Sequence, residues 1–141
     1  LHDSLAEIGG ALIGAWLSKI GDGTAVPLPQ ESDGVTYAEK VDRSETRIDW
    51  RETARNLVRR INAFAPAPGA WTELGKDRVK ILAAQVIAGD GAPGTVLSDQ
   101  LAVACGDGAI KIERLQVAGR QPLDAKAFLA GRTVSAGARF D

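Results

Sequence analysis

Arginines between residues 51 and 60 are the residues of this sequence whose type and spacing most clearly suggest chemistry. Arg51, Arg55 and Arg59 recur at four-residue steps, and Arg60 follows directly. Residues four apart lie on one side of a helix, so the spacing predicts a row of guanidinium groups. Such groups match phosphate geometry and release counterions when they bind a polyanion. The alternative is a solvated helix face on which Glu52 pairs with a neighbouring arginine, and from spacing alone this is the favoured interpretation.

The sequence offers little for the common catalytic arrangements. It holds one cysteine, Cys105, and one histidine, His2, so it cannot supply a Cys/His metal cluster or place a histidine in a Ser-His-Asp set. Cys105 lies in the apolar run LAVAC, where a buried and unreactive thiol is expected. We therefore predict neither a metal centre nor hydrolysis by a familiar triad.

Length and charge predict one domain preceded by an acidic leader. The 141 residues suffice for one core and an appendage. Residues 1–45 carry three basic and eight acidic residues, a net charge of −5, whereas residues 46–141 carry fourteen and ten, a net +4. Basic surface on a compact domain is one feature of polyanion binding. There is no apolar run of about 18 residues and no signal peptide, so we expect no membrane partner and a cytoplasmic location.

The N-terminal part reads as a helix followed by a linker. Apolar residues at spacings of three and four predict a helix over residues 1–20, with Gly21 at its C-terminal cap. The apolar stripe needs a partner, so we expect this helix to belong to a preceding domain that the chain lacks. The residues that follow are rich in Gly, Pro and acidic side chains, which is typical of a linker.

A second helix is expected to begin at Asp49. Asp49 occupies the N-cap position and Glu52 the capping-box position three residues later. Pro66 ends the helix because its ring cannot continue the hydrogen-bond ladder. One face of this predicted helix is apolar and consists of Trp50, Ala54, Leu57, Ile61 and Phe64.

Beyond Pro66 the pattern changes to short strands. The segments AWTEL, RVKILAAQVI, TVL, LAVAC and AIKIERLQV are separated by turn residues, among them Asp-Gly at 107–108. Asp124 is expected to cap a short helix, AKAFLAG, that ends at Gly131. The fold class we predict is mainly β, a small open Greek-key barrel of the oligonucleotide-binding (OB) type with flanking helices. Periodicity alone does not separate this barrel from a small sandwich.

Aromatic residues and one loop arginine are further candidates for binding. Trp50, Phe64 and Trp71 could stack on nucleobases, but the first two lie on the apolar helix face, which favours core packing. Arg120 follows a predicted strand in the segment VAGRQPL. That position is a loop tip, where binding residues are often displayed, although plain solvent exposure fits equally well.

Five phrases of the sequence occur in a specific order: LHDSLAEIGGALI, GVTYAEKVDRSETRIDW, AFAPAPGAWTEL, PGTVL and VACGDGAIKIERLQVAGRQPLDAKAFLAGR. In order and spacing they resemble the C-terminal half of bacterial methionyl-tRNA formyltransferases, over about residues 1–132. The resemblance implies a missing N-terminal Rossmann-like catalytic domain, which in this family uses 10-formyltetrahydrofolate to formylate the amino group of initiator methionyl-tRNA. The family's catalytic residues lie in that domain, so we expect no catalytic residue and no cofactor in this chain.

The resemblance also implies a binding surface for tRNA. The family holds the acceptor arm of the tRNA with basic residues of its linker and C-terminal domain. Lys40 and Arg120 match basic positions of the family. Arg43 and Arg47 are inferred because they lie, with Lys40, in an extended connector over residues 35–48, and the remaining candidates come from the helix row. The predicted tRNA-binding residues are Lys40, Arg43, Arg47, Arg51, Arg55, Arg59 and Arg120.

These inferences divide the chain into three parts. Residues 1–22 are expected to be the terminal helix of the missing catalytic domain, residues 23–46 the interdomain linker, and residues 47–141 the OB-like C-terminal tRNA-binding domain. Related C-terminal domains occur in nucleotide-sugar formyltransferases and formyltetrahydrofolate dehydrogenase, so these remain alternatives. A stand-alone RNA-binding barrel is another, although the unpartnered first helix argues against it.

Overall fold

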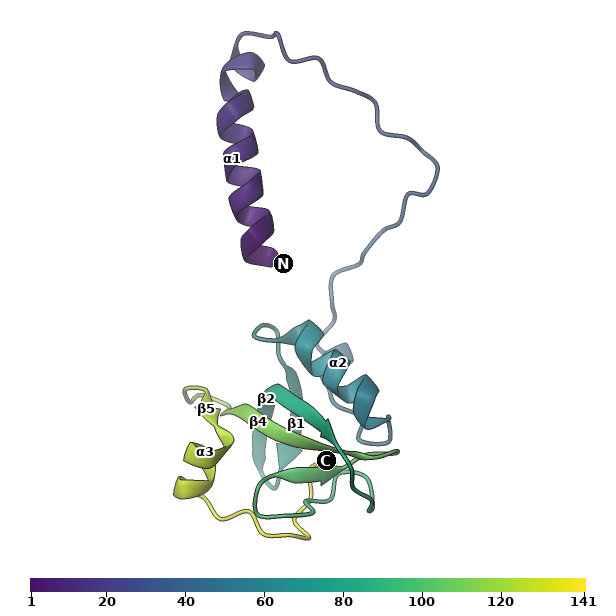
Figure 1. Cartoon of the computed structure of the whole chain (residues 1–141), viewed down its shortest axis with the longest axis vertical. Helices are drawn as coiled ribbons and strands as arrows, with labels where there is room; N and C mark the ends of the chain where they lie inside the picture. The colour runs from purple at the N-terminus through teal and green to yellow at the C-terminus, as the bar shows by residue number, and fades with distance from the viewer. The chain divides into compact units, whose positions relative to one another are not determined.

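The computed structural model describes all 141 residues, which form two compact units, Leu1–Glu39 and Lys40–Asp141. Figure 1 shows the chain and its elements. The first unit holds helix α1 (His2–Gly21), none of whose residues is buried. The helix ends one residue later than predicted, with Asp22 as its C-terminal cap. No helix in the structure has the length and apolar character that crossing a membrane requires. The three-part division of the chain stays a prediction.

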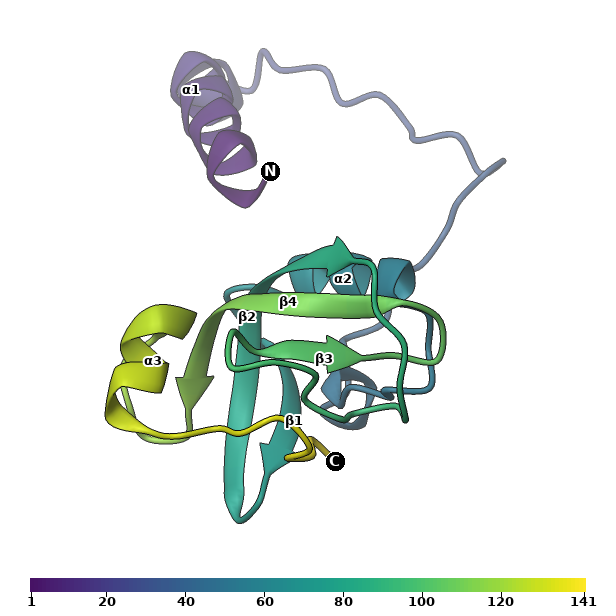
Figure 2. The ribbon, with the colours of Figure 1, turned by 60° about the horizontal axis from the view of Figure 1, so that its bottom comes forward.

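The second unit is built around one antiparallel sheet. Its strands are β1 (Ala70–Leu74), β2 (Asp77–Ile87), β3 (Ala102–Ala104), β4 (Ala109–Val117) and β5 (Leu123–Asp124). The strand order is β1-β2-β4-β3, and β5 pairs with the C-terminal half of β4. A register shift near Ala83, where β2 meets β4, bends the strand, and Figure 2 shows the sheet curling into a half-barrel. The mainly β prediction is confirmed, and the curled sheet is consistent with an OB-like fold.

Helix α2 (Ala54–Phe64) covers the sheet and begins five residues after the predicted cap. The capping-box prediction is wrong. Thr53 is the N-cap, and its hydroxyl accepts a hydrogen bond from the backbone N–H of Asn56 at 3.3 Å. Asp49 instead accepts bonds from the backbone and side chain of Arg51, and Glu52 pairs with Arg60. Local side-chain bonds of this kind compete with helix formation. Arg51 therefore does not belong to the helix, and the predicted three-arginine row is wrong.

The apolar face of α2 packs as the sequence predicted. Ala54, Leu57 and Ile61 are buried, and Phe64 packs partly against the same core. Burying a Leu or Ile side chain contributes about 1.5–3 kcal/mol each, so this face holds α2 on the sheet. Trp50 is also buried, which confirms core packing, although it lies ahead of the helix. The helix ends at Phe64, just before Pro66, as expected.

Two segments differ from the predicted strands. The segment TVL makes only isolated bridges, Thr95 with Arg139 and Val96 with Val103, and forms no strand. The C-terminal residues, which sequence reasoning left unassigned, run beside β1. There Glu73 and Asp141 exchange backbone hydrogen bonds of 2.9 and 3.0 Å. The C-terminal segment therefore covers the outer edge of β1.

Helix α3 (Ala125–Gly131) lies beside β4 and has the predicted bounds. Asp124 is its N-cap residue, but the carboxylate makes no capping hydrogen bond. Phe128 is the buried residue of the helix and joins the core cluster. Packing of Phe128 therefore holds this short helix without a side-chain cap.

Cys105 is expected to resist alkylation in the folded chain. Burial leaves the residue 4% exposed and raises the pKa of the thiol from 9.0 to about 11, so the reactive thiolate is scarce near pH 8. Unfolding lowers the pKa again, so stability from this group is complete below pH 9 and is lost as pH rises through about 11. Iodoacetamide at pH 8, followed by mass spectrometry, checks the prediction. Equal labelling of the native and urea-unfolded chain would contradict it.

Candidate nucleic-acid interface

The connector that precedes α2 belongs to the second unit from Lys40 onward, and side-chain hydrogen bonds hold it there. It contains a short 3-10 helix, η1 (Ser44–Thr46). The hydroxyl of buried Thr46 donates to the carbonyl of Arg43 at 2.8 Å. Arg60 of α2 donates to the carbonyl of Glu45 and forms a 2.8 Å ion pair with Glu52. Arg60 therefore has a structural role, because its side chain holds the connector against α2.

The same connector lies against Trp71 of β1. The backbone N–H of Ile48 donates to the carbonyl of Trp71 at 2.8 Å, and Arg47 forms a bridge with Trp71. The indole Nε1 of Trp71 donates to the carbonyl of Arg43 at 3.4 Å. Two predicted binding residues, Arg43 and Arg47, are therefore brought to one aromatic side chain.

Strand pairing brings two further cations to Trp71. In the β1–β2 hairpin Trp71 lies opposite Lys80, and Glu73 lies opposite Arg78. Side chains two residues apart on a strand share a face, so Arg78 and Lys80 project on the side of Trp71. The guanidinium carbon of Arg78 lies 3.8 Å from the centroid of the Trp71 ring, and that of Arg47 lies 5.1 Å from it.

Trp71, Arg78 and Lys80 help to line a groove of about 560 Å³, which we call the Trp71 groove. Gly69 makes room for it. Its φ of +85° favours glycine, and a Cβ there would lie 2.9 Å from Cδ of Lys80 and push the lysine stem aside. The residues that line the groove are Arg43, Ser44, Thr46, Pro68, Gly69, Trp71, Arg78 and Lys80.

The Trp71 groove is positively charged. Three cations line it, Arg43, Arg78 and Lys80, with no carboxylate among the lining residues, and none of the three forms an ion pair. Arg47 stands at its margin and is 3.6 Å from Glu73. Unpaired guanidinium and ammonium groups beside an aromatic ring are typical of surfaces that bind nucleic-acid phosphates.

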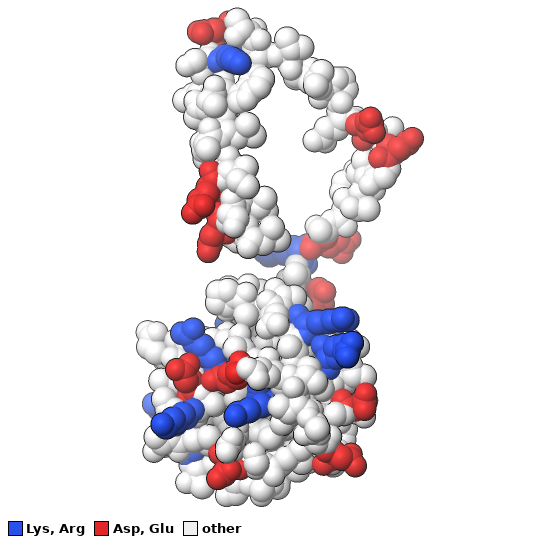
Figure 3. Space-filling view, viewed as in Figure 1, with Lys and Arg blue, Asp and Glu red and all other residues white.

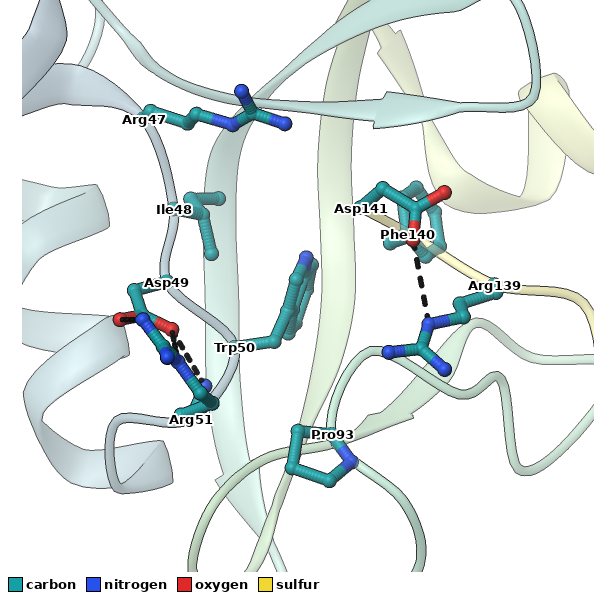
Figure 4. A pocket seen from close by; sticks show the side chains of 9 residues that line it. All are labelled: Arg47, Ile48, Asp49, Trp50, Arg51, Pro93, Arg139, Phe140 and Asp141. Carbon is teal, nitrogen blue, oxygen red and sulfur yellow. Dashed lines mark hydrogen bonds and ion pairs between the residues drawn. The ribbon is translucent and has the colours of Figure 1, made fainter.

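Arg51 lies in a different hollow, of about 390 Å³ (Figure 4). Its Nε and Nη2 donate to the two carboxylate oxygens of Asp49 at 2.8 and 2.7 Å. The side-chain and backbone bonds from Arg51 hold the pKa of Asp49 at about 2. Arg139, in the same hollow, pairs with Asp141 at 3.3 Å. The charges here are largely balanced, so this hollow is a weaker candidate for an anion.

Arg55 and Arg59 lie on the exposed side of α2 and form no ion pair. They do not line the Trp71 groove. Figure 3 shows a basic patch over α2, within a face where basic and acidic side chains are interspersed. They remain candidate phosphate contacts on a separate surface.

The two residues chosen by resemblance also lie outside the groove. Arg120 is exposed in the turn between β4 and β5 and lines a hollow with Asp77, Phe128 and Arg132. Lys40 is exposed at the start of the second unit and lines none of the described hollows. The predicted residues thus fall on several surfaces, of which only Arg43 and Arg47 meet at Trp71.

Arg78 and Lys80 are candidate binding residues that sequence reasoning missed. A signal was present, because the alternation in DRVKIL places both on one face of a strand. Trp71 and Glu73 alternate in the same way across a short turn at Gly75 and Lys76. Pairing the two strands as a tight hairpin is enough to place the two cations beside the tryptophan.

Comparison with known proteins identifies the family to which this chain belongs. Residues 40–133 match the model of the formyl transferase C-terminal domain, and the chain belongs to that family. Its relatives include methionyl-tRNA formyltransferases of Ruegeria pomeroyi, 48% identical over 140 residues, and Acidiphilium cryptum, 47% identical over 140 residues. Each alignment covers 99% of this chain and 46% or 45% of the relative, so the chain spans about half the length of these proteins.

Solved structures support the same fold. HypX from Aquifex aeolicus, crystallised in complex with tetrahydrofolic acid, aligns with a TM-score of 0.64 over 80% of this chain and 21% of its own. A variant of the same protein aligns with a TM-score of 0.66 over 87% of this chain and 23% of its own. Sequence identities of 22% and 21% mean that this similarity establishes the fold alone.

Proposed function

We propose that this chain is the C-terminal, tRNA-binding part of a methionyl-tRNA formyltransferase. A catalytic domain of the Rossmann type, joined through α1, would transfer the formyl group of 10-formyltetrahydrofolate to the amino group of initiator methionyl-tRNA. This chain would hold the tRNA so that its aminoacyl end reaches that domain. The observation that carries the proposal is the 48% identity to such an enzyme over nearly the whole chain.

The surface of the second unit supports a role in tRNA binding rather than in binding the formyl donor. Residues 40–141 hold sixteen basic and twelve acidic residues, a net charge of +4, and the Trp71 groove concentrates unpaired cations. A folate needs an enclosed, largely apolar site with few polar groups. The hollows of the second unit are all lined by charged side chains, and we assign no residue to the formyl donor.

A chimera tests the proposal. The matched C-terminal part of the Ruegeria pomeroyi enzyme is replaced by this chain, and formylation of initiator methionyl-tRNA is measured. We expect kcat/KM within about tenfold of the parent, a difference of about 1.4 kcal/mol in transition-state stabilisation. The truncated parent, which lacks any C-terminal part, is the control. A folded chimera no more active than the truncated parent would favour a related formyltransferase or a stand-alone RNA-binding barrel.

A further inference from the structure

We propose that the Trp71 groove binds a phosphate of the tRNA backbone, with Arg78 and Lys80 of β2 as its principal contacts. The inference rests on the proposed function and adds the contact residues and the chemical group that they recognise. Neither residue was selected by the sequence pattern or by the family resemblance. Four observations support it: the state of the Trp71 ring, the free donors of Arg78, the path of Lys80 and the anchored connector.

The two arginines that lie over the Trp71 ring favour a phosphate over a nucleobase as the ligand. Two guanidinium groups lie over the ring, at 3.8 and 5.1 Å from its centroid. A nucleobase that stacked on a face covered by a guanidinium would have to displace that cation, which would forfeit the cation–π attraction. Trp71 therefore acts as a support for arginine rather than as a platform for a base.

Stacking leaves the hydrogen-bonding edge of Arg78 available. A guanidinium presents its five N–H donors in its own plane, and Arg78 makes no side-chain hydrogen bond and no ion pair in the structure. The side chain is exposed and held by the ring. Its donors are therefore oriented before a phosphate arrives, which lowers the entropy lost on binding.

Lys80 and the connector complete the site. Lys80 lies opposite Trp71, and its half-buried stem passes close to Gly69. Arg43 enters from the connector, which Arg60 ties to α2 and which Ile48 joins to Trp71 through a backbone hydrogen bond. By contrast, Arg55 and Arg59 stand on α2 with no ring to hold them. Ordering such free side chains costs conformational entropy, so we expect them to contribute less.

Salt titration of tRNA binding tests the assignment with matched double variants of the 141-residue chain. Arg78→Gln with Lys80→Gln removes the groove pair, Arg55→Gln with Arg59→Gln the helix pair, and Arg114→Gln with Lys126→Gln two exposed charges elsewhere. All three lower the net charge equally. We expect the groove variant to reduce the slope of log K against log salt by about 0.9, since the groove neutralises one phosphate and each phosphate contact contributes about 0.9. The other two should change the slope by less than half as much.

The outcomes separate the inference from the function it rests on. A wild-type chain that does not bind tRNA defeats the proposed function, whereas binding with an unchanged slope in the groove variant defeats only the inference. A larger effect of the helix pair also defeats it. The variant Arg78→Lys with Lys80→Arg keeps both charges and should retain the slope. Unchanged melting temperatures show that the surface substitutions leave the fold intact.

Two further probes distinguish the source of the phosphate. An acceptor-stem duplex without its unpaired 3′ end should show the same loss with the groove variant. If the loss requires the unpaired end, the groove does not contact the backbone of the stem, contrary to the expected result. Inorganic phosphate should compete no better than sodium chloride at equal ionic strength. Specific competition that disappears in the groove variant would show a free-anion site instead.

Discussion

Replacing Gly106 by alanine is expected to destabilise the second unit by about 3 kcal/mol. The added Cβ would collide with the carbonyl oxygen of Arg51, far inside contact distance. The turn before β4 would have to move away from the start of α2. Two backbone hydrogen bonds of 2.9 Å join these segments, Gly106 to Glu52 and Ala54 to Asp107. Overpacking costs about 1–3 kcal/mol and each lost bond about 1 kcal/mol.

Urea unfolding followed by circular dichroism measures this loss. Gly131→Ala is the matched control, because a Cβ on Gly131 would meet no atom within 4 Å and its φ is not in the left-handed region. It should leave stability within about 0.5 kcal/mol of the wild type. Similar stability in the two variants would show that the turn at Gly106 can move away from Arg51 at no cost in free energy of unfolding, which would contradict the prediction.

Phe140→Ala should have an effect of the same size, about 3–5 kcal/mol. Phe140 is 1% exposed, and its ring centroid lies 5.6 Å from that of Trp50. Its backbone N–H donates to the carbonyl of Gly94 at 2.9 Å. Removing the ring leaves a cavity beneath the C-terminal segment. That segment includes Asp141, whose carbonyl accepts the hydroxyl of Thr72 at 2.8 Å.

The same unfolding measurement, with near-ultraviolet circular dichroism of the tryptophans, checks the second prediction. Phe140→Leu keeps an apolar side chain and should cost less than half as much. Val86→Ala, at an exposed position of β2, should cost about 0.5 kcal/mol or less. If Phe140→Ala matches Val86→Ala, the C-terminal segment does not belong to the core.

The strands and helices were predictable where local signals agreed. The Asp-Gly turn at 107–108 and the apolar runs beside it indicated β3 and β4, and Pro66 indicated the end of α2. The start of α2 was predicted wrongly because Asp49 satisfies the capping pattern but bonds to Arg51 instead. The pairing of Glu73 with Asp141 was missed because contacts between distant residues leave no local pattern.

The candidate binding surface was predictable only in part for the same reason. Arg43 and Arg47 were chosen for their place in the connector, and the structure brings both to Trp71. The predicted row of Arg51, Arg55 and Arg59 required one continuous helix. Because α2 begins at Ala54, Arg51 lies outside the helix and only Arg55 and Arg59 remain on it. Arg78 and Lys80 come close to Trp71 only through the pairing of β1 with β2. A search for cations at helical spacing therefore does not select them.

The burial of Cys105 makes the chain a ready subject for site-directed probes. It is the single thiol of the sequence and lies shielded inside the core. Ser44 lines the Trp71 groove and is exposed, so Ser44→Cys would carry the one readily reactive sulfur. A photoactivatable cross-linker or a spin label attached there would test whether nucleotides approach the groove, free of background from the rest of the molecule.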